Sequence, residues 1–169
     1  MRQLVTVLLL LTLAQCARAD TPATQPSDEP EALEARFAAI ARVLGPGGVD
    51  KDEVFTYTLP RTDLEVRTDA GAVPASVAES RFHFFKCECG KMNVVGQFVL
   101  ADYEANDVID ALREGHIKVV SVGPMLIGEQ PRVLVVRFQG EGGSTTIAQT
   151  IKSALDWTGP ARMTTQPAR

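Results

Sequence analysis

The fold is decided by residues 94–159, which read VVGQFVL (94–100), ADYEANDVIDALREG (101–115), IKVVSV (117–122), PRVLVVRFQG (131–140) and STTIAQTIKSALDWTG (144–159). Apolar residues dominate the first, third and fourth segments, which predicts strands. They recur at helical spacing in the second and fifth, which predicts helices over 102–114 and 144–158. The order β-α-β-β-α predicts an α+β fold, with an antiparallel or mixed sheet of about six strands and helices mainly on one face.

Residues 30–93 add one helix and further strands to this core. A helix is predicted over 30–44, where Asp28 can cap the start and Pro30 tolerates the first turn. Its apolar face comprises Leu33, Phe37, Ile40 and Leu44.

Three segments before residue 94 have the composition of strands. Residues 54–59 and 64–68 alternate apolar and polar side chains, and the turn at 60–63 is expected to join them. Residues 69–79 are expected to form a loop. The aromatic-rich segment 81–86 is expected to form a hairpin with 94–100, with Gly90 near its tip.

Composition indicates one globular domain without affinity for polyanions. The chain has 169 residues, of which 45% are hydrophobic and 22% charged, and its formal net charge is −4. Because phosphate neutralisation dominates affinity for nucleic acids, an acidic chain without a basic stripe is not expected to bind them. The same charge argues against binding to anionic membrane surfaces.

The N-terminus is typical of an exported protein. Residues 1–19 contain Arg2, an apolar run over 4–13 that is too short to span a bilayer, and the small-x-small sequence 17–19, which together predict a signal peptide cleaved before Asp20. The sequence before Cys16 is similar to a lipobox, so lipidation of Cys16 is the alternative. We expect a flexible spacer over 20–29, one domain over 30–159 and a disordered tail over 160–169. The protein is therefore expected in the periplasm or outside the cell, without a transmembrane helix in its mature form.

Four short motifs stand in an order that resembles a known family: PRTDL (60–64), VGQFVL (95–100), EQPR (129–132) and LDWTG (155–159). Over residues 50–159 the chain is similar to the LppY/LpqO-like family of exported bacterial proteins, which are built on a domain of unknown function. The resemblance implies export and a shared fold, and it implies no particular reaction. The matching polar residues are candidates for ligand binding: Arg61, Asp63, Glu104, Asn106, Glu129 and Arg132.

The chain departs from that family at its polar positions. The family's His-Asn-His segment falls on Gly123, Pro124 and Met125, and two further histidines fall on Arg137 and Glu141. Gln97 stands where the family has an acid. If those histidines bind metal or act as acids and bases, this chain has lost that apparatus.

Cys87 and Cys89 form the most unusual local motif. In a strand they would share a face with His83, and two sulfurs and an imidazole suit zinc or copper. The spacing departs from the usual C-x₂₋₄-C of zinc sites, and a Cys87–Cys89 bond would close a small ring of the kind that is often redox-active. The alternative is a pair of small residues at a hairpin end, oxidised or free.

Three other features have a structural interpretation beside the functional one. His116 follows a helix end, where a cation is favourable. Arg61 and Asp63 either fix a turn or form a site with Arg132. The sequence GEGG (140–143) precedes a helix, and backbone N–H groups at such a point can bind an anion. It lacks the lysine of a phosphate-binding loop and is more simply a connector.

Three functional hypotheses follow. The first is a non-enzymatic domain that binds a small molecule or an envelope protein and needs no cofactor. The second is a redox or metal protein that uses Cys87, Cys89 and His83. The third is a hydrolase that uses the remaining carboxylates, which requires two of them to converge in one pocket with raised pKa values.

Overall fold

The computed structural model describes residues 32–159. The expected signal peptide with Cys16, the spacer, Asp28, Pro30 and the tail lie outside that range. The elements in chain order are α1 (Leu33–Leu44), β1 (Gly48–Lys51), β2 (Val54–Pro60), β3 (Arg67–Thr68), β4 (Gly71–Ala72), β5 (Glu79–Lys86), β6 (Met92–Ala101), η1 (Asp102–Glu104), α2 (Ala105–Glu114), β7 (Lys118–Pro124), β8 (Val133–Gly142) and α3 (Ser144–Leu155). Among the described residues, no helix is long and apolar enough to cross a membrane.

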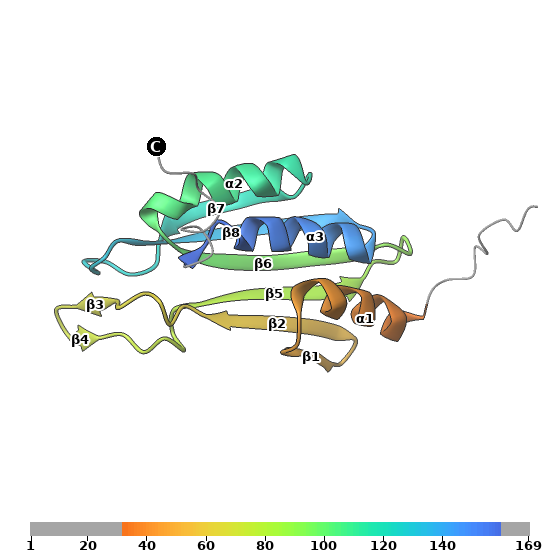
Figure 1. Ribbon diagram of the computed structural model, residues 1–169, viewed down its shortest axis with the longest axis horizontal. Helices are drawn as coiled ribbons and strands as arrows, with labels where there is room; N and C mark the ends of the chain where they lie inside the picture. The colour runs from red at the N-terminus through yellow and green to blue at the C-terminus, as the bar shows by residue number, and fades with distance from the viewer. Residues whose placement is uncertain (1–31, 160–169) are drawn as a thin grey trace, which may run out of the picture.

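Six strands form one sheet in the order β1-β2-β5-β6-β8-β7. Every neighbouring pair is antiparallel, so the predicted α+β class is confirmed and the sheet is antiparallel rather than mixed. The predicted hairpin is present as β5 and β6. Strands β3 and β4 form a separate two-stranded arm, which extends beyond the end of the sheet in Figure 1.

All three helices lie on one face of the sheet (Figure 1), as predicted. Their buried side chains join a single core with the strand residues of that face. At its centre the rings of Phe82, Phe98 and Phe138 lie 4.8–5.9 Å apart, and Phe37 of α1 stacks on Phe55 of β2 at 5.4 Å. Burial of each such ring contributes about 1.5–3 kcal/mol, so this packing fixes which face the helices cover.

The other face of the sheet carries mainly polar side chains, because successive strand residues point to opposite faces. At one end it is covered by the segments that lead into and out of the β3–β4 arm, where Val66, Ala78, Val99, Val133 and Val135 form a second small core. No described helix packs on the rest, and Val95 at its centre is 45% exposed. We call this surface the open face; it comprises Thr56, Thr58, Arg81, His83, Phe85, Asn93, Val95, Gln97, Lys118, Ser121, Arg137, Gln139 and Glu141.

The prediction of a strand over 64–68 paired with 54–59 was wrong. β2 pairs instead with β5. Within 64–68 only Arg67–Thr68 is a strand. It pairs in the arm with β4, which lies in the segment 69–79 that was expected to be a loop. The alternation of Leu64 and Val66 reflects packing in the second core.

β1 was missed altogether, because the turn that joins it to β2 lacks the usual glycine. Asp52 and Glu53 take positive φ angles of 53° and 62° there, as in a two-residue type I′ hairpin.

Gly96 tests the packing of the helix-covered face. A Cβ at this position would lie 2.7 Å from a ring carbon of Phe138 and 2.8 Å from the Arg81 carbonyl oxygen, whereas a Cβ on Gly123 of β7 meets nothing within 4 Å. We expect Gly96→Ala to lower the free energy of unfolding by about 1–3 kcal/mol. Gly123→Ala should leave it unchanged or raise it by about 0.5 kcal/mol. Urea denaturation of both variants measures this difference, and equal effects would contradict the packing described.

Candidate functional site

Three of the residues proposed to bind a ligand form one buried ion cluster at the end of β2. Arg61 is 5% exposed and Glu104 is fully buried. Arg61 donates from Nη1 and Nη2 to the two carboxylate oxygens of Glu104 at 2.8 and 3.0 Å, and from Nε and Nη2 to Asp63 at 2.8 and 2.7 Å. It also donates to the Val99 carbonyl oxygen. The guanidinium is therefore saturated by the protein itself.

Glu104 extends this cluster to two other parts of the chain. Its Oε2 accepts a hydrogen bond from the Ala101 N–H at 2.9 Å, as an acid in the first helical turn commonly does. Its Oε1 accepts one from the Gly159 N–H at 2.7 Å. The cluster thus joins the ends of β2 and β6, the start of α2 and the C-terminal segment. This geometry supports the interpretation of Arg61 and Asp63 as a pair that fixes a turn, without Arg132.

The hydrogen bonds of Arg61 hold the pKa of Asp63 below its ordinary value of 3.8, despite partial burial. A general acid of a hydrolase needs the opposite shift. Asp63 and Glu104 therefore converge on a cation that neutralises them.

The other three proposed residues lie apart from this cluster. Asn106 is exposed at the start of α2. Glu129 and Arg132 lie in the β7–β8 loop, where both line a shallow pocket of about 410 Å³ together with Leu126 and Ile127. Glu129 is 7% exposed, and its Oε1 accepts a hydrogen bond from the Val133 N–H at 3.3 Å; its Oε2 has no partner among the described residues. Arg132 is exposed.

A concavity of about 480 Å³ lies mainly on the open face. Phe85 of β5 and Val95 of β6 give its lining an apolar part, and Asn93 and Gln139 add amides. Its remaining lining residues are Val94, His116, Lys118, Gly140 and Glu141. Pockets of this size and mixed character are typical of small-molecule sites.

Positive charge gathers on the open face of this acidic chain. Lys118 and Arg137 are exposed and form no ion pair with the other residues in 32–159. The acids on the face are neutralised locally, since Glu141 pairs with Lys91 at 3.2 Å and Glu79 pairs with Arg81. The two unpaired cations leave the face with a local excess of positive charge, which attracts anions.

Both histidines of the chain lie on or beside the open face. Thr56 Oγ1 and His83 Nδ1 are 3.0 Å apart. Partial burial, with a smaller contribution from the nearby Arg81 charge, lowers the pKa of His83. Its ring is therefore neutral at pH 7, with one nitrogen that can donate a hydrogen bond and one that can accept one. His116 directly follows the Gly115 cap of α2 with a positive φ of 59°, and it lines the cavity instead of only capping the helix.

Several positions at which the chain departs from the resembled family also fall on the open face. Gln97 of β6 lies opposite Arg137 of β8, and Arg137 lies opposite Ser121 of β7. Glu141 of β8 lies on this face opposite Asn93, and Gly123 of β7 pairs with Val135 at its covered end. The departures therefore change one contiguous surface.

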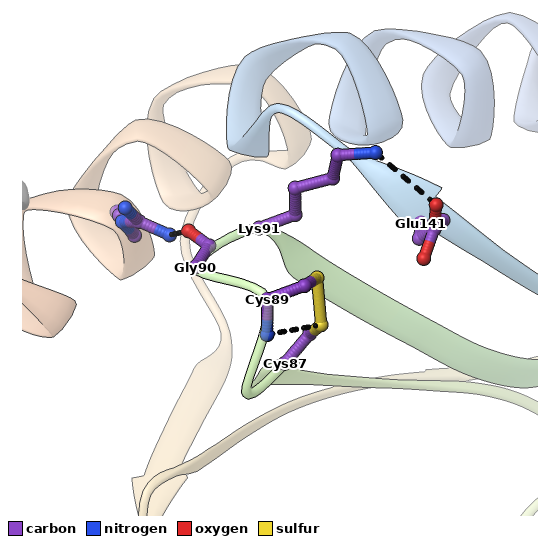
Figure 2. Close-up of a disulfide and its surroundings, with 6 residues drawn as sticks. Cys87, Cys89, Gly90, Lys91 and Glu141 are labelled. Carbon is purple, nitrogen blue, oxygen red and sulfur yellow. Dashed lines mark hydrogen bonds and ion pairs between the residues drawn. A yellow bond between two sulfur atoms is a disulfide. The ribbon is translucent and has the colours of Figure 1, made fainter.

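Cys87 and Cys89 form a disulfide at the turn between β5 and β6 (Figure 2). The acidic side chain beside them is Glu141, and the metal-ligating atoms of these three residues lie within 4.8 Å of one another. His83 is not part of this group. The shared strand parity placed it on the correct face but too far along β5.

Sequence reasoning did not identify the cavity. Its residues come from β5, β6, β7, β8 and the α2–β7 turn, and no local motif joins them. The available signal was the alternation within each strand, in which Phe85, Asn93, Val95, Gln139 and Glu141 all have the parity opposite to the core residues.

A family model described as "Domain of Unknown Function (DUF1259)" matches residues 38–157, which include the whole ion cluster except Gly159 and the whole open face. No curated protein and no solved structure matches the chain.

The structural role of the ion cluster can be tested with Glu104→Gln. This change keeps the shape of the side chain but removes the buried negative charge from beside Arg61, so we expect the free energy of unfolding to fall by about 3 kcal/mol. The matched control is Glu114→Gln at the exposed end of α2, which should change it by less than about 0.5 kcal/mol. Urea denaturation at neutral pH measures both. A Glu104 variant as stable as the control would show that the carboxylate is kept for a ligand.

Proposed function

The chain belongs to the family described as a Domain of Unknown Function (DUF1259), and from that premise we propose that it is an exported, non-enzymatic binding protein. The open face holds its ligand, a small organic anion with an apolar body. The observation that carries this proposal is the cavity on the open face, whose lining combines apolar Phe85 and Val95 with Lys118, a cation that has no ion-pair partner among residues 32–159.

The lining of the cavity supports this class of ligand. Phe85 and Val95 offer an apolar surface, which favours a molecule with a ring or short aliphatic body. Lys118 supplies a positive charge at the rim, and the amides of Asn93 and Gln139 offer hydrogen bonds that fix orientation. A carboxylate or phosphate group on the ligand would supply the ion-pair partner that Lys118 does not find among residues 32–159.

The absence of catalysis is supported by the use of the acidic residues. Asp63 and Glu104 neutralise Arg61, Glu79 pairs with Arg81, and Glu141 pairs with Lys91. The neutral ring of His83 bonds to Thr56 and has no carboxylate partner in the described range. A site that only binds and orients a ligand does not need an acid or base whose pKa is tuned for proton transfer.

Export is supported by the N-terminal sequence and by the resemblance to the LppY/LpqO-like family. Residues 1–19 have the charge, apolar run and small-x-small site of a signal peptide. An exported domain meets small molecules outside the cytoplasm, where a binding protein would capture them.

Binding can be tested with benzoate as the probe, because it combines an anion with an apolar ring. We expect benzoate to shift the amide resonances of Phe85, Val95 and Gln139 in a nitrogen-15 NMR titration of the full chain. Lys118→Ala should weaken the affinity about tenfold, the effect of losing one charge-assisted hydrogen bond.

The matched control is Lys152→Ala, which removes an exposed lysine from α3 on the helix-covered side. It should leave benzoate affinity unchanged. Equal affinity of the two variants, or shifts confined to residues away from the open face, would refute the anion site. Shifts on the open face with a cell extract but not with benzoate would point instead to a protein partner.

The export prediction is tested by the N-terminus of the protein recovered from its producing cell. Cleavage by signal peptidase should give a chain that begins at Asp20. Lipidation should give a membrane-bound chain that begins at a modified Cys16, and Cys16→Ser should then abolish the modification. Mass spectrometry distinguishes the two, and a chain that retains Met1 in the cytoplasm would contradict export.

A further inference from the structure

The turn that carries Cys87 and Cys89 is held by its backbone as well as by the disulfide. The Cys87 N–H donates to the Lys91 carbonyl oxygen at 2.9 Å, and the Gly90 N–H donates to the Cys87 carbonyl oxygen at 3.0 Å. Arg36 of α1 donates to the Gly90 carbonyl oxygen, as Figure 2 shows. Because these bonds do not involve the S–S bond, the turn can keep its place when that bond opens.

Glu141 of β8 faces this turn from the neighbouring strand (Figure 2). Its position is set by the pairing of Glu141 with Asn93 in the sheet, which places it beside the β5–β6 turn. The two sulfur atoms and one carboxylate oxygen lie within 4.8 Å of one another. Glu88, which stands between the two cysteines, is not in this group.

These three atoms fit the preferences of zinc after a small movement. Zn–S bonds of about 2.3 Å and tetrahedral angles require two thiolates about 3.8 Å apart, and a carboxylate oxygen binds at about 2.0–2.2 Å. The sulfurs would separate when the bond opens, which an exposed turn with Gly90 at φ 84° can accommodate. The Cys89 N–H already donates to Cys87 Sγ at 2.9 Å, and such a donor stabilises a thiolate.

We propose that Cys87, Cys89 and Glu141 form a redox-gated zinc site at the β5–β6 turn. A dithiol reductant opens the Cys87–Cys89 bond: the two protein sulfurs gain two electrons and two protons, and the dithiol becomes a disulfide. Zn²⁺ then displaces both protons and is bound by two thiolates, the Glu141 carboxylate and water. The oxidised protein offers only the carboxylate and does not hold the ion.

Lys91 is the built-in competitor for this site. Its Nζ lies 3.2 Å from Glu141, and both side chains are more than half exposed, so their ion pair is weak and a divalent cation can replace it. Glu141 also lines the cavity of the open face. Zinc binding would therefore remove a negative charge from the rim of that cavity, although the zinc site itself does not depend on the proposed anion ligand.

The test is a zinc titration of the full chain, against a chromophoric zinc chelator, in a Cys16→Ser background that removes the third thiol. One sample is oxidised and the other is reduced with a phosphine that is then removed. We expect one equivalent of Zn²⁺ to bind to the reduced chain and none to the oxidised chain. Cd²⁺ should give the ultraviolet absorption of thiolate coordination in the reduced sample alone.

Variants separate a true site from unspecific thiol binding. Glu141→Gln should weaken zinc binding at least tenfold, since loss of even an outer contact to a metal ligand commonly costs about 10–100-fold. Glu88→Gln is the matched control and should bind within about twofold of the parent. Cys87→Ser and Cys89→Ser should each abolish thiolate absorption. The proposal is overturned if the reduced chain binds no zinc, or if Glu141→Gln and Glu88→Gln bind it equally.

Discussion

The strict alternation of side chains along β6 is the constraint on which the rest of the structure depends. β6 lies between β5 and β8, and its residues Val94, Phe98 and Leu100 point to the helix-covered core while Asn93, Val95 and Gln97 point to the open face. A slip of one residue would exchange the two faces. Gly96 fixes the register further, because the Phe138 ring and the Arg81 carbonyl leave no room for a side chain there. The helices, the core and the open face all take their positions from this strand.

The buried ion cluster holds together the end of the sheet at which β2 and β6 end, which side-chain alternation alone does not fix. β5 lies between β2 and β6, which end at the same end of the sheet. There the chain turns into the arm after β2 and into α2 after β6. Arg61 and Glu104 join these turns, and Glu104 also holds Gly159. A buried pair of this kind adds little net stability over an apolar pair, but it fixes geometry, because each charge must find its partner. The residues that resemble a ligand site thereby serve the fold.

The surface available for chemistry is the side of the sheet that faces away from the helices, which includes the open face and the β5–β6 turn. The helices cover the apolar face of the sheet, so its other face is free to carry cations, amides and the half-buried ring of Phe85. The disulfide and Glu141 stand at the edge of the same surface. The cavity proposed to bind a ligand, the disulfide and the Glu141 carboxylate are therefore neighbours, although they derive from segments that are about fifty residues apart.

The sequence by itself determined the fold class, the three helices and the β5–β6 hairpin, because periodicities of two and of about three and a half residues are local properties of the chain. Tertiary structure alone decided that β2 pairs with β5 and that residues 64–68 lie outside the six-stranded sheet. The contacts that fix this arrangement are distant in sequence, since Glu104, the second partner of Arg61, is 43 residues away. It also decided that Arg61, Asp63 and Glu104 are buried, and that Glu141 rather than His83 meets the cysteines. The pattern on one strand shows which face a side chain takes, but the register between strands decides which residues meet there.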